Sequence, residues 1–345
     1  MKKIFFLTTL LSFNLLILSS INPVSAQNRI DNQGRRQGKW IKTDTDGSRI
    51  FEGEFKDGKE IGVFKYYYPD GKLKIRNTFT IPGRYCSHEA FDNQGRLIAK
   101  GFYDQQNRDS VWLFYNEEGK LIKRSSYRMG IKQGLHVIFT DQGDTAEVTN
   151  WLDNRRHGRW WKRVGRNGHI TANYVNGKLE GRIVEYDDNG KMAREGNYKD
   201  GVKDGHNRLF EEGVPSVDET WSLGTLTDRK VRLSCPTEKW FSIYSIAYYL
   251  PKGSNGTSLY LNDGTRLICT ESPDIVGQRL GDGPFVIVDR KSRLVANTNN
   301  IEGIEKDADG REILKLSPAL PFSVFPDDEC KKMVRSLNRI DELDQ

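Results

Sequence analysis

The feature that most constrains the fold of this chain is a glycine that recurs at a constant interval. The series is Gly47, Gly71, Gly95, Gly119 and Gly143, and it continues with small slips at Gly168 and Gly190. An aromatic residue stands eight positions after each of the first five glycines: Phe55, Phe79, Tyr103, Tyr127 and Trp151. A repeat that keeps two residue types in register over seven units predicts a structural unit of about 24 residues.

Each unit has the local chemistry of a β-hairpin. Dipeptides such as Asp46-Gly47 and Asn189-Gly190 favour turns with positive φ, where glycine carries little steric cost. Between the turns, apolar and charged residues alternate with the period of a strand, as in residues 72–79. A small residue stands two positions before the repeated aromatic, and we expect it to make room for a ring of the adjacent hairpin. These small residues are Gly53, Asn77, Gly101, Ser125, Thr149 and Gly196.

Two segments carry the resemblance to a known family: EGEFKDGKEIGVFKYYYPDGK (residues 52–72) and EGNYKDGVKDGHNRLFEEG (residues 195–213). They resemble MORN repeats, and more closely the bacterial MORN-repeat-variant family. The resemblance extends from Asp31 to Gly213, although residues 81–87 and 104–110 lack the usual glycine pair. It implies an all-β fold, an elongated single-layer sheet of antiparallel hairpins in which each repeat is stabilised by its neighbours. It also implies scaffolding, with anionic lipid headgroups or proteins as ligands.

Aromatic residues are expected on both faces of such a sheet. One repeated position holds Trp40, Phe64, Trp112, His136, Trp160 and Ile183; three residues later, on the opposite face, come Thr43, Tyr67, Tyr115, Phe139, Arg163 and Tyr186. One set can form the ladder of rings that joins the hairpins, with the other half-covered by curvature of the sheet. Because a single layer cannot bury both faces, the alternative is that some aromatic surface binds a partner.

The densest charge cluster is RRHGRWWKRVGRNGH, residues 155–169. Trp160 takes the repeated ring position, so Arg159, Trp161 and Arg163 are expected on the other face. Cations beside an indole suit phosphates, anionic lipid headgroups or acidic glycans, whereas the plainer interpretation is a solvated strand face with a cross-strand Trp. The candidate ligand-binding residues are Arg155, Arg156, Arg159, Trp161, Arg163, Arg166, Tyr67, Tyr115, Phe139 and Tyr186.

The periodicity stops at Gly213, so residues 27–213 are expected to form the repeat domain and residues 214–345 a separate one. Short aliphatic runs such as FVIVD (residues 285–289), with Asp263-Gly264 and Asp309-Gly310 as turns, predict a compact β-sandwich or a partly open barrel. A short C-terminal helix is expected over residues 327–337, capped by Asp327 or Asp328. We recognise no family in this second domain.

Composition and charge exclude several classes of protein. Hydrophobic residues make up 36% of the chain, aromatic residues make up 11%, and glycines number 33. These values do not fit a polytopic membrane protein or a mostly disordered chain. Residues 27–213 carry 34 basic and 27 acidic residues, a net +7, and residues 214–345 carry 17 and 20, a net −3. This asymmetry is too mild for a dedicated nucleic-acid-binding protein.

Residues 1–26 have the features of a secretory signal peptide. Lys2 and Lys3 precede an apolar stretch, and residues 24–26 (VSA) form a small-residue cleavage site. The alternative is a retained anchor, although the apolar stretch falls short of the roughly 20 residues of a membrane span. Cleavage would place the chain in the periplasm, at the cell surface or outside the cell, with no transmembrane span. In such an oxidising compartment we expect one disulfide within the C-terminal third, which contains Cys235, Cys269 and Cys330, or else buried free thiols.

No motif for catalysis, for a cofactor or for a metal is recognisable. None of the five histidines stands in an HExxH helix or near a GxSxG serine. Cys86 and His88 share a strand face, but no third member or oxyanion feature accompanies them. We therefore predict no catalytic residue, no cofactor and no metal; the alternative is an envelope hydrolase with carboxylates such as Asp263, Asp274, Asp282 or Asp289 in residues 214–345.

The sequence therefore predicts an exported, non-enzymatic binding or scaffold protein of a bacterial cell envelope. Its repeat sheet would present aromatic and basic residues to a protein, an anionic lipid or a glycan. Nucleic acid is not an expected partner.

Overall fold

The computed structural model describes residues 27–341, so the predicted signal peptide lies outside the described residues. The described residues divide into two compact units, residues 27–107 and residues 108–341, and both contain consecutive β-hairpins. The all-β class and the consecutive antiparallel hairpins predicted from the repeat are both confirmed.

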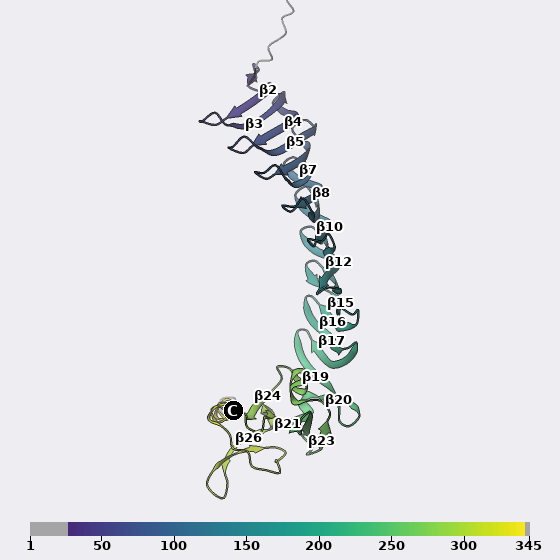
Figure 1. Cartoon of the computed structure of the whole chain (residues 1–345), viewed down its shortest axis with the longest axis vertical. Coiled ribbons are helices and arrows are strands. Elements are labelled where there is room, and N and C mark those ends of the chain that lie inside the picture. Colours follow the sequence, from purple (N-terminus) through teal and green to yellow (C-terminus); the bar gives the residue numbers. More distant parts are fainter. Residues whose placement is uncertain (1–26, 342–345) are drawn as a thin grey trace, which may run out of the picture. The chain divides into compact units, whose positions relative to one another are not determined.

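The first unit is an antiparallel sheet in which each strand pairs with the next one in the chain (Figure 1). Turns such as the one at Gly71 have a positive φ, here 83°, as the dipeptide chemistry predicts. The strands are β1 (Arg29–Ile30), β2 (Arg36–Thr43), β3 (Arg49–Lys56), β4 (Lys59–Tyr67), β5 (Leu73–Ile81), β6 (Tyr85–Phe91) and β7 (Leu97–Asp104).

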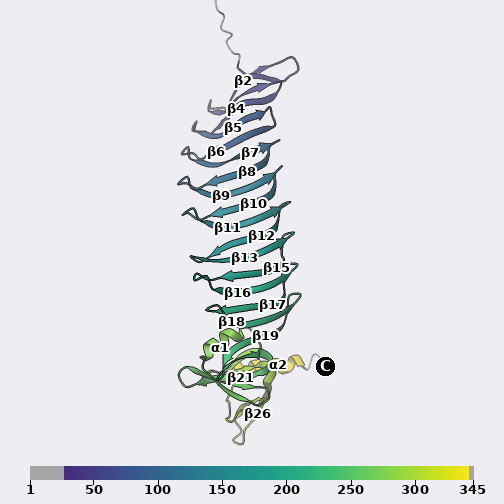
Figure 2. The ribbon, with the colours of Figure 1, turned by 90° about the vertical axis from the view of Figure 1, so that its right-hand side faces the viewer.

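The second unit begins with a longer run of the same kind, in which successive strands lie beside one another like rungs (Figure 2). Its strands are β8 (Asn107–Tyr115), β9 (Leu121–Arg128), β10 (Ile131–Phe139), β11 (Thr145–Leu152), β12 (Arg155–Val164), β13 (Gly168–Val175), β14 (Lys178–Leu179), β15 (Gly181–Tyr186), β16 (Met192–Lys199), β17 (Val202–Glu211), β18 (Val214–Ser222), β19 (Thr225–Ser234) and β20 (Glu238–Ser242).

Within each unit the repeated rings lie on one face of the sheet, which we call the ladder face. It carries Trp40, Phe64, Trp112, His136 and Trp160, and each of these is directly opposite a small residue on the next strand. At Gly53 an added Cβ would lie 2.5 Å from two ring atoms of Phe64, on the following strand. The predicted role of the small residue is confirmed there. The other side of the sheet is called the opposite face.

The hairpin sheet continues past the point where the sequence periodicity ends. Strand β17 pairs with β18, β18 with β19 and β19 with β20, so the last hairpins come after Gly213. Trp221 on β18 still carries a ring, whereas other inward positions of β18 and β19 are aliphatic, with Val217, Val231 and Leu233 almost fully buried. The domain boundary expected after residue 213 stays a prediction.

Beyond β20 the chain forms an open five-stranded sheet in the order β23-β22-β21-β25-β24, followed by the two-stranded hairpin of β26 and β27. The turns at Gly264 and Gly310 are confirmed, with φ values of 84° and 77°. The elements are η1 (Ile243–Ser245), β21 (Ile246–Lys252), β22 (Gly256–Leu261), β23 (Arg266–Cys269), α1 (Pro273–Leu280), β24 (Phe285–Asp289), β25 (Leu294–Asn297), η2 (Thr298–Asn300), β26 (Ile301–Lys306), β27 (Glu312–Leu316) and α2 (Asp328–Asp341).

The five-stranded sheet lies between two apolar cores. One core joins it to the last hairpins and to α1 through residues such as Val231, Phe241 and Leu280. The other joins it to β27 and α2 through residues such as Leu314 and Val334. The predicted compact β-rich part is therefore layered on both faces of one sheet, as expected for a stable packing of elements with apolar faces.

Both helices follow capping rules, although α1 was not predicted from the sequence. Ser272 accepts a hydrogen bond from the backbone N–H of Ile275, and Pro273 begins α1. At α2 the carboxylate of Asp327 accepts a hydrogen bond from the N–H of Cys330 at 2.8 Å, which confirms the predicted cap. Among the described residues, no helix combines the length and the apolar character needed to cross a bilayer.

Candidate functional site

The predicted candidate residues centre on β12, where Trp161 lies on the opposite face. Trp161 stands in a cross-strand row that is apolar at its centre. The indole of Trp161 stacks on His169 at a centroid distance of 6.0 Å, and His169 stacks on Tyr186 at 4.9 Å. In order across the sheet, the row is Arg124, Val137, Val148, Trp161, Thr171 and Val184.

Arginines surround this row. By strand alternation, the opposite face of β9 to β13 carries five of them, and none of its strand positions holds Asp or Glu. Four of the five have no ion-pair partner among the residues that the structure describes, and these four are solvent-exposed. We call the set the basic patch: Arg124, Arg128, Arg155, Arg159 and Arg163, of which Arg163 alone has a carboxylate within 4.0 Å.

The basic patch differs from the same face a few strands further along. There Arg182 pairs with Glu195 at 2.7 Å, and Arg208 contacts Glu195 at 3.1 Å and Asp218 at 3.3 Å. In this stretch, from β15 to β18, the arginines of the opposite face are neutralised by ion pairs. The contrast follows from the register, because cross-strand neighbours in β15 to β18 alternate in sign whereas those in β9 to β13 do not.

Arg163 has a structural role as well as a charge. Its guanidinium donates to the backbone carbonyl of Thr145 at 3.2 Å and to that of Arg166 at 3.1 Å, and its Nη2 lies 3.7 Å from Asp144. These contacts tie two turns together. Arg163 is therefore less available to a ligand than Arg159, which the structure leaves exposed on the same strand.

The remaining predicted candidates are not all brought to this place. Arg156 lies on the ladder face, where its guanidinium stacks on Tyr174 at 5.3 Å and donates to the Tyr174 hydroxyl. Arg166 is exposed in the turn after β12. Tyr115 and Phe139 are half-buried on the opposite face of the second unit.

Tyr67 belongs to the first unit and has its own partners. Its hydroxyl donates to Glu52 at 2.6 Å, and Arg49 lies 5.5 Å from its ring centroid. The hydroxyl of Tyr67 is the main cause that lowers the pKa of Glu52, and Lys65 and Arg49 lower it further. The hydroxyl and the ring of Tyr67 are thus both engaged by neighbouring side chains of the first unit.

Two members of the basic patch, Arg124 and Arg128, were not predicted from the sequence. Arg124 stands beside Lys123 in the chain, but it meets the row of Trp161 only through the pairing of β9 with β10 and of β10 with β11. The available signal was the alternation within residues 121–128, which assigns both arginines to the face away from Tyr127.

The carboxylates considered for a hydrolase do not converge. Asp263 caps its own turn by accepting from the N–H of Thr265, Asp274 pairs with Arg293, and Asp289 accepts from Ser292. Asp274 is the only carboxylate among the described residues that line the cavity of about 520 Å³ beside α1. Hydrolysis of a glycosidic bond normally needs two carboxylates about 5–10 Å apart, which this cavity does not offer.

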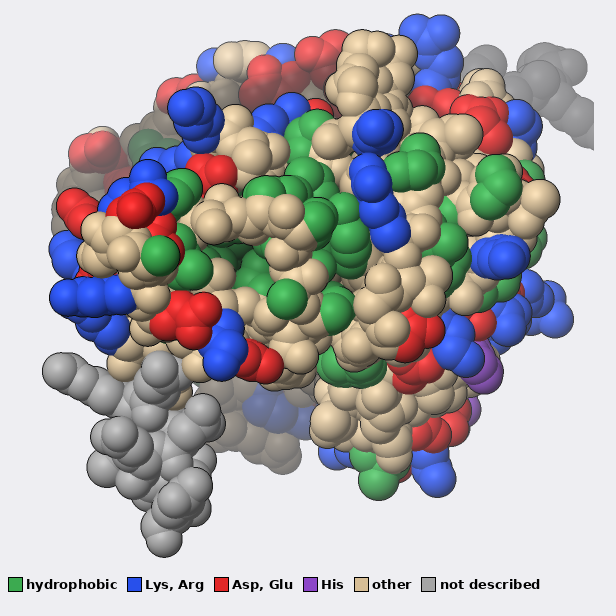
Figure 3. All heavy atoms as spheres, turned by 90° about the horizontal axis from the view of Figure 1, so that it is seen from below, with side chains coloured by type: hydrophobic (Ala, Val, Ile, Leu, Met, Phe, Trp, Pro, Cys, Tyr) green, Lys and Arg blue, Asp and Glu red, His purple; other side chains and the backbone are tan. Residues whose placement is uncertain are grey.

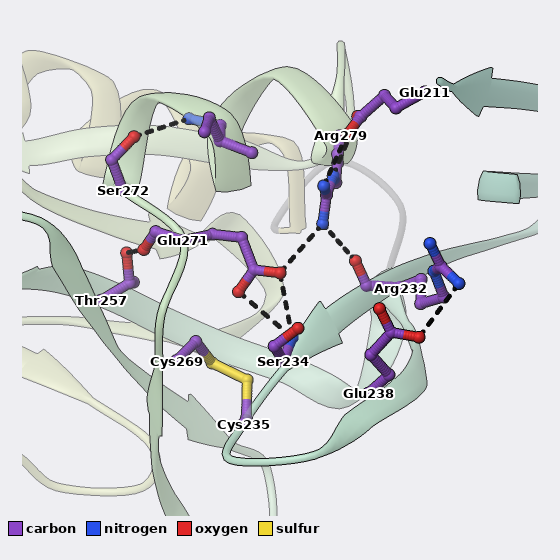
Figure 4. Close-up of polar contacts among 11 residues, drawn as sticks. Glu211, Arg232, Ser234, Cys235, Glu238, Thr257, Cys269, Glu271, Ser272 and Arg279 are labelled. Carbon is purple, nitrogen blue, oxygen red and sulfur yellow. Dashed lines mark hydrogen bonds and ion pairs between the residues drawn. A yellow bond between two sulfur atoms is a disulfide. The ribbon is translucent and has the colours of Figure 1, made fainter. Parts of the chain in front are cut away.

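A buried ionic cluster centred on Arg279 joins elements of the C-terminal part of the chain (Figure 4). The guanidinium of Arg279 on α1 donates to Glu271 at 3.2 Å and to exposed Glu211 at 2.6 Å, and Glu271 accepts from the N–H of Ser234 at 3.0 Å. Next to it, a disulfide joins Cys235 to Cys269. Helix α1, the turn after β19 and strand β23 are thereby held together.

The other two cysteines, Cys86 and Cys330, are buried free thiols, so the expected disulfide and the alternative of free thiols both occur. Burial raises the pKa of Cys86, which opposes formation of a nucleophilic thiolate. His88 is also buried, with Nδ1 2.8 Å from the side-chain oxygen of Asn77. Among the described residues, no group of three or more His, Cys, Asp or Glu side chains is arranged to hold a metal ion.

Apolar side chains are also exposed on the C-terminal part of the chain. Figure 3 looks at the molecule from below the view of Figure 1, and hydrophobic side chains gather near the middle of that view with charged side chains around them. The exposed apolar residues of this part include Trp240, Tyr244, Ile287, Phe322 and Phe325.

The fold defines the class of protein: a β-hairpin-repeat protein in which each repeat unit adds two strands to a sheet. The family model of the MORN repeat variant matches residues 60–80 and 179–200. The first segment spans the hairpin of β4 and β5, and the second runs from β14 to β16. The resemblance inferred from the sequence is thus confirmed at these two segments, and repeats of this family indicate a binding or scaffold role. No curated protein matches the chain.

Proposed function

We propose that this chain is a non-enzymatic scaffold whose hairpin sheet uses the basic patch to bind an anionic partner. The observation that carries the proposal is the unbalanced charge of the opposite face from β9 to β13, where five arginines face no acidic strand position. A surface that needs only solubility gains nothing from concentrating one sign of charge, whereas a surface that binds anions does. The stack of Trp161, His169 and Tyr186 adds a flat apolar platform beside the arginines.

The chemistry of the patch favours phosphate or carboxylate groups on an extended partner. Guanidinium groups bind these planar or tetrahedral anions through paired N–H donors. Successive strands are about 4.8 Å apart, so Arg124 and Trp161 are separated by roughly 14 Å across three strand intervals. A membrane surface rich in anionic headgroups, an acidic glycan or an acidic protein segment each spans that distance, and a single small anion does not.

The proposal includes export of the chain to a bacterial cell envelope. The support is the amino-acid pattern of residues 1–26, with Lys2 and Lys3 before an apolar stretch and a small-residue site at its end. The disulfide between Cys235 and Cys269 agrees with an oxidising compartment. An envelope location would bring the basic patch close to anionic lipids and glycans.

The test is flotation of the chain from residue 27 onward with vesicles of anionic or neutral lipid across a salt series. We expect binding to anionic vesicles that weakens as salt screens the arginines. The double variant Arg124→Ala/Arg159→Ala should reduce this binding about tenfold or more, because each basic residue near an anionic surface contributes about 1 kcal/mol.

The matched control is Arg182→Ala/Lys230→Ala, which removes two charges from ion pairs on the same face. Both control side chains are more than half exposed, so little stability is lost. Equal loss of binding in the two double variants would mean that net charge, and not the basic patch, attracts the vesicles. Binding that ignores lipid charge would redirect the search to a glycan or a protein partner, with acidic polysaccharide as the next probe.

A further inference from the structure

On the ladder face, one repeated position holds a cation that stacks on an aromatic ring. The cation stands at or near the start of a strand that follows the second turn of the repeat, and the ring comes later in the chain at a nearly constant spacing. Five hairpins share this arrangement, with the cation 4.2–5.7 Å from the ring centroid. The pairs are Arg36 with Phe55, Arg108 with Tyr127, Lys132 with Trp151, Arg156 with Tyr174, and Lys203 with Trp221.

In one hairpin of the first unit this position is acidic. Glu60 precedes Phe79 by the same spacing that separates Arg36 from Phe55, so the pattern calls for Lys or Arg there. Among the described residues, no Lys or Arg side chain stacks on Phe79, whose ring has an edge contact with Phe64 at 5.6 Å. The ring therefore lacks the cation that five of its counterparts have.

A cavity of about 330 Å³ opens at this place. Its walls include the rings of Tyr66, Phe79 and Tyr103, the carboxylate-bearing Glu60 and the buried thiol of Cys86. Glu60 has no ion-pair partner among the residues that the structure describes. Its charge contributes to the raised pKa values of Tyr66 and Cys86, after burial as the main cause, so the carboxylate acts on the lining of the cavity.

The one arginine that lines the cavity does not supply the missing cation. Arg84 stands at the repeated position of the next hairpin, but its guanidinium is held by Asp104 through contacts of 2.9 Å and 3.3 Å. This ion pair neutralises Arg84 and keeps it from stacking on a ring. The charge left over within the cavity lining is that of Glu60.

We propose that this cavity binds the ammonium group of a small primary alkylamine, which takes the place that Lys or Arg holds in five other hairpins. Aromatic faces attract cations, and the carboxylate of Glu60 provides an acceptor for charge-assisted N–H hydrogen bonds. Tyr66, with its polar hydroxyl, is one of the residues that line the same cavity. The ammonium end would be held by Glu60 and the rings, and the alkyl chain would extend out of the open side.

Primary amines suit the cavity better than quaternary ammonium ions. A quaternary ion has no N–H to donate, so it would use the rings but not the hydrogen-bonding capacity of Glu60. Anions are disfavoured because Glu60 has no cation of its own. The ligand differs in sign from the anionic partner of the basic patch, so this inference does not depend on the proposed function.

The test is calorimetric titration of the chain from residue 27 onward with n-butylammonium chloride. Titrations with n-butanol and tetramethylammonium chloride serve as neutral and quaternary controls. We expect saturable binding of n-butylammonium, at least tenfold weaker binding of tetramethylammonium and none of n-butanol. Absence of saturable binding to the wild-type chain, or equal binding of the alcohol, would overturn the proposal.

Two variants at one position keep the test independent of folding. Glu60→Gln should weaken n-butylammonium binding at least tenfold. Glu60→Lys should abolish binding and raise the thermal midpoint, because it restores the cation of the repeat pattern over Phe79. Glu54→Gln, on the neighbouring strand β3, is the matched control and should bind as the wild type does. Unchanged binding in Glu60→Lys would contradict the proposed place of the ammonium group.

The same chemistry could come from a free amine or from the ethanolamine headgroup of a lipid. Vesicles of phosphatidylethanolamine and of phosphatidylcholine distinguish these sources. Preference for ethanolamine vesicles that Glu60→Lys removes identifies the headgroup as the ligand. Binding of the free amine without any preference between the vesicles identifies a small molecule.

Discussion

The close approach of Phe64 to Gly53 on the ladder face gives the sharpest prediction about stability. Replacing Gly53 by Ala would place a Cβ 2.5–2.6 Å from three ring atoms of Phe64. Carbon atoms normally pack about 3.5–4.0 Å apart, so the two groups would have to separate by roughly 1 Å. Phe64 is only 1% exposed and has edge contacts with Phe55 at 5.1 Å and with Phe79 at 5.6 Å, so its ring cannot retreat.

The sign of this effect depends entirely on the ring. Gly53 does not have a positive φ, so Ala would be compatible with its backbone and would by itself stabilise the strand by about 0.5–1 kcal/mol. Overpacking a filled core costs about 1–3 kcal/mol. We therefore expect Gly53→Ala to lower the local free energy of unfolding by about 2 kcal/mol. In a Phe64→Ala background, the same change should be neutral or stabilising.

Hydrogen exchange of the amides in β3, β4 and β5 measures this locally. A loss of about 2 kcal/mol corresponds to exchange that is roughly 30-fold faster. Gly71→Ala is the control, because Gly71 has no heavy atom within 4 Å of the added Cβ but has a φ of 83°. Its cost should be that of backbone strain and should not depend on Phe64. If Gly53→Ala costs the same with and without the ring of Phe64, the steric reasoning is refuted.

Three further predictions concern the second unit. Replacing Cys235 and Cys269 by Ala should lower stability by about 4 kcal/mol in urea unfolding, because the disulfide closes a loop with a sequence separation of 34; equal stability would contradict this. Arg279→Met should cost about 3–5 kcal/mol, because it leaves the carboxylate of Glu271, only 12% exposed, without its cation; a cost below about 1 kcal/mol, as for an exposed ion pair, would argue against a buried pair. Burial lowers the pKa of His136 from its usual value of 6.5, so its contribution to stability is complete above that pH and is lost as the pH falls through the lowered pKa. Thermal midpoints between pH 7.5 and pH 5 should fall less in His136→Phe than in the wild type, and parallel curves would disprove the assignment.

Much of the hairpin architecture was predictable because its causes are local. Turns at residues such as Gly71 depend on dipeptide chemistry, and the alternation of Trp160 with Trp161 depends on the two-residue period of a strand. Helix α1 was missed because it has only eight residues and follows strands in an otherwise β-rich segment. Its Ser272-Pro273 start was the available signal.

The sequence by itself determined the repeat unit, its turns and the face on which each ring lies, because these follow from spacing within a single repeat. Only the tertiary structure decided which arginines remain unpaired. Arg208 is neutralised because Glu195 and Asp218 lie on the strands beside it, whereas Arg124 has only Leu113 and Val137 opposite it. The partner of each charge is set by the register between strands, and that register places side by side residues that are far apart in the chain.

The same physical reason governs the disulfide and the cavity at Glu60. Three cysteines in the C-terminal third allowed several pairings, and the packing of β23 beside the turn after β19 selected Cys235 with Cys269. Glu60 breaks the cationic pattern in the sequence, but only the tertiary structure shows the cavity beside it and the ion pair that joins Arg84 to Asp104. Spacing along the chain specified the hairpin repeats of this protein, and contacts between neighbouring strands specified its sites.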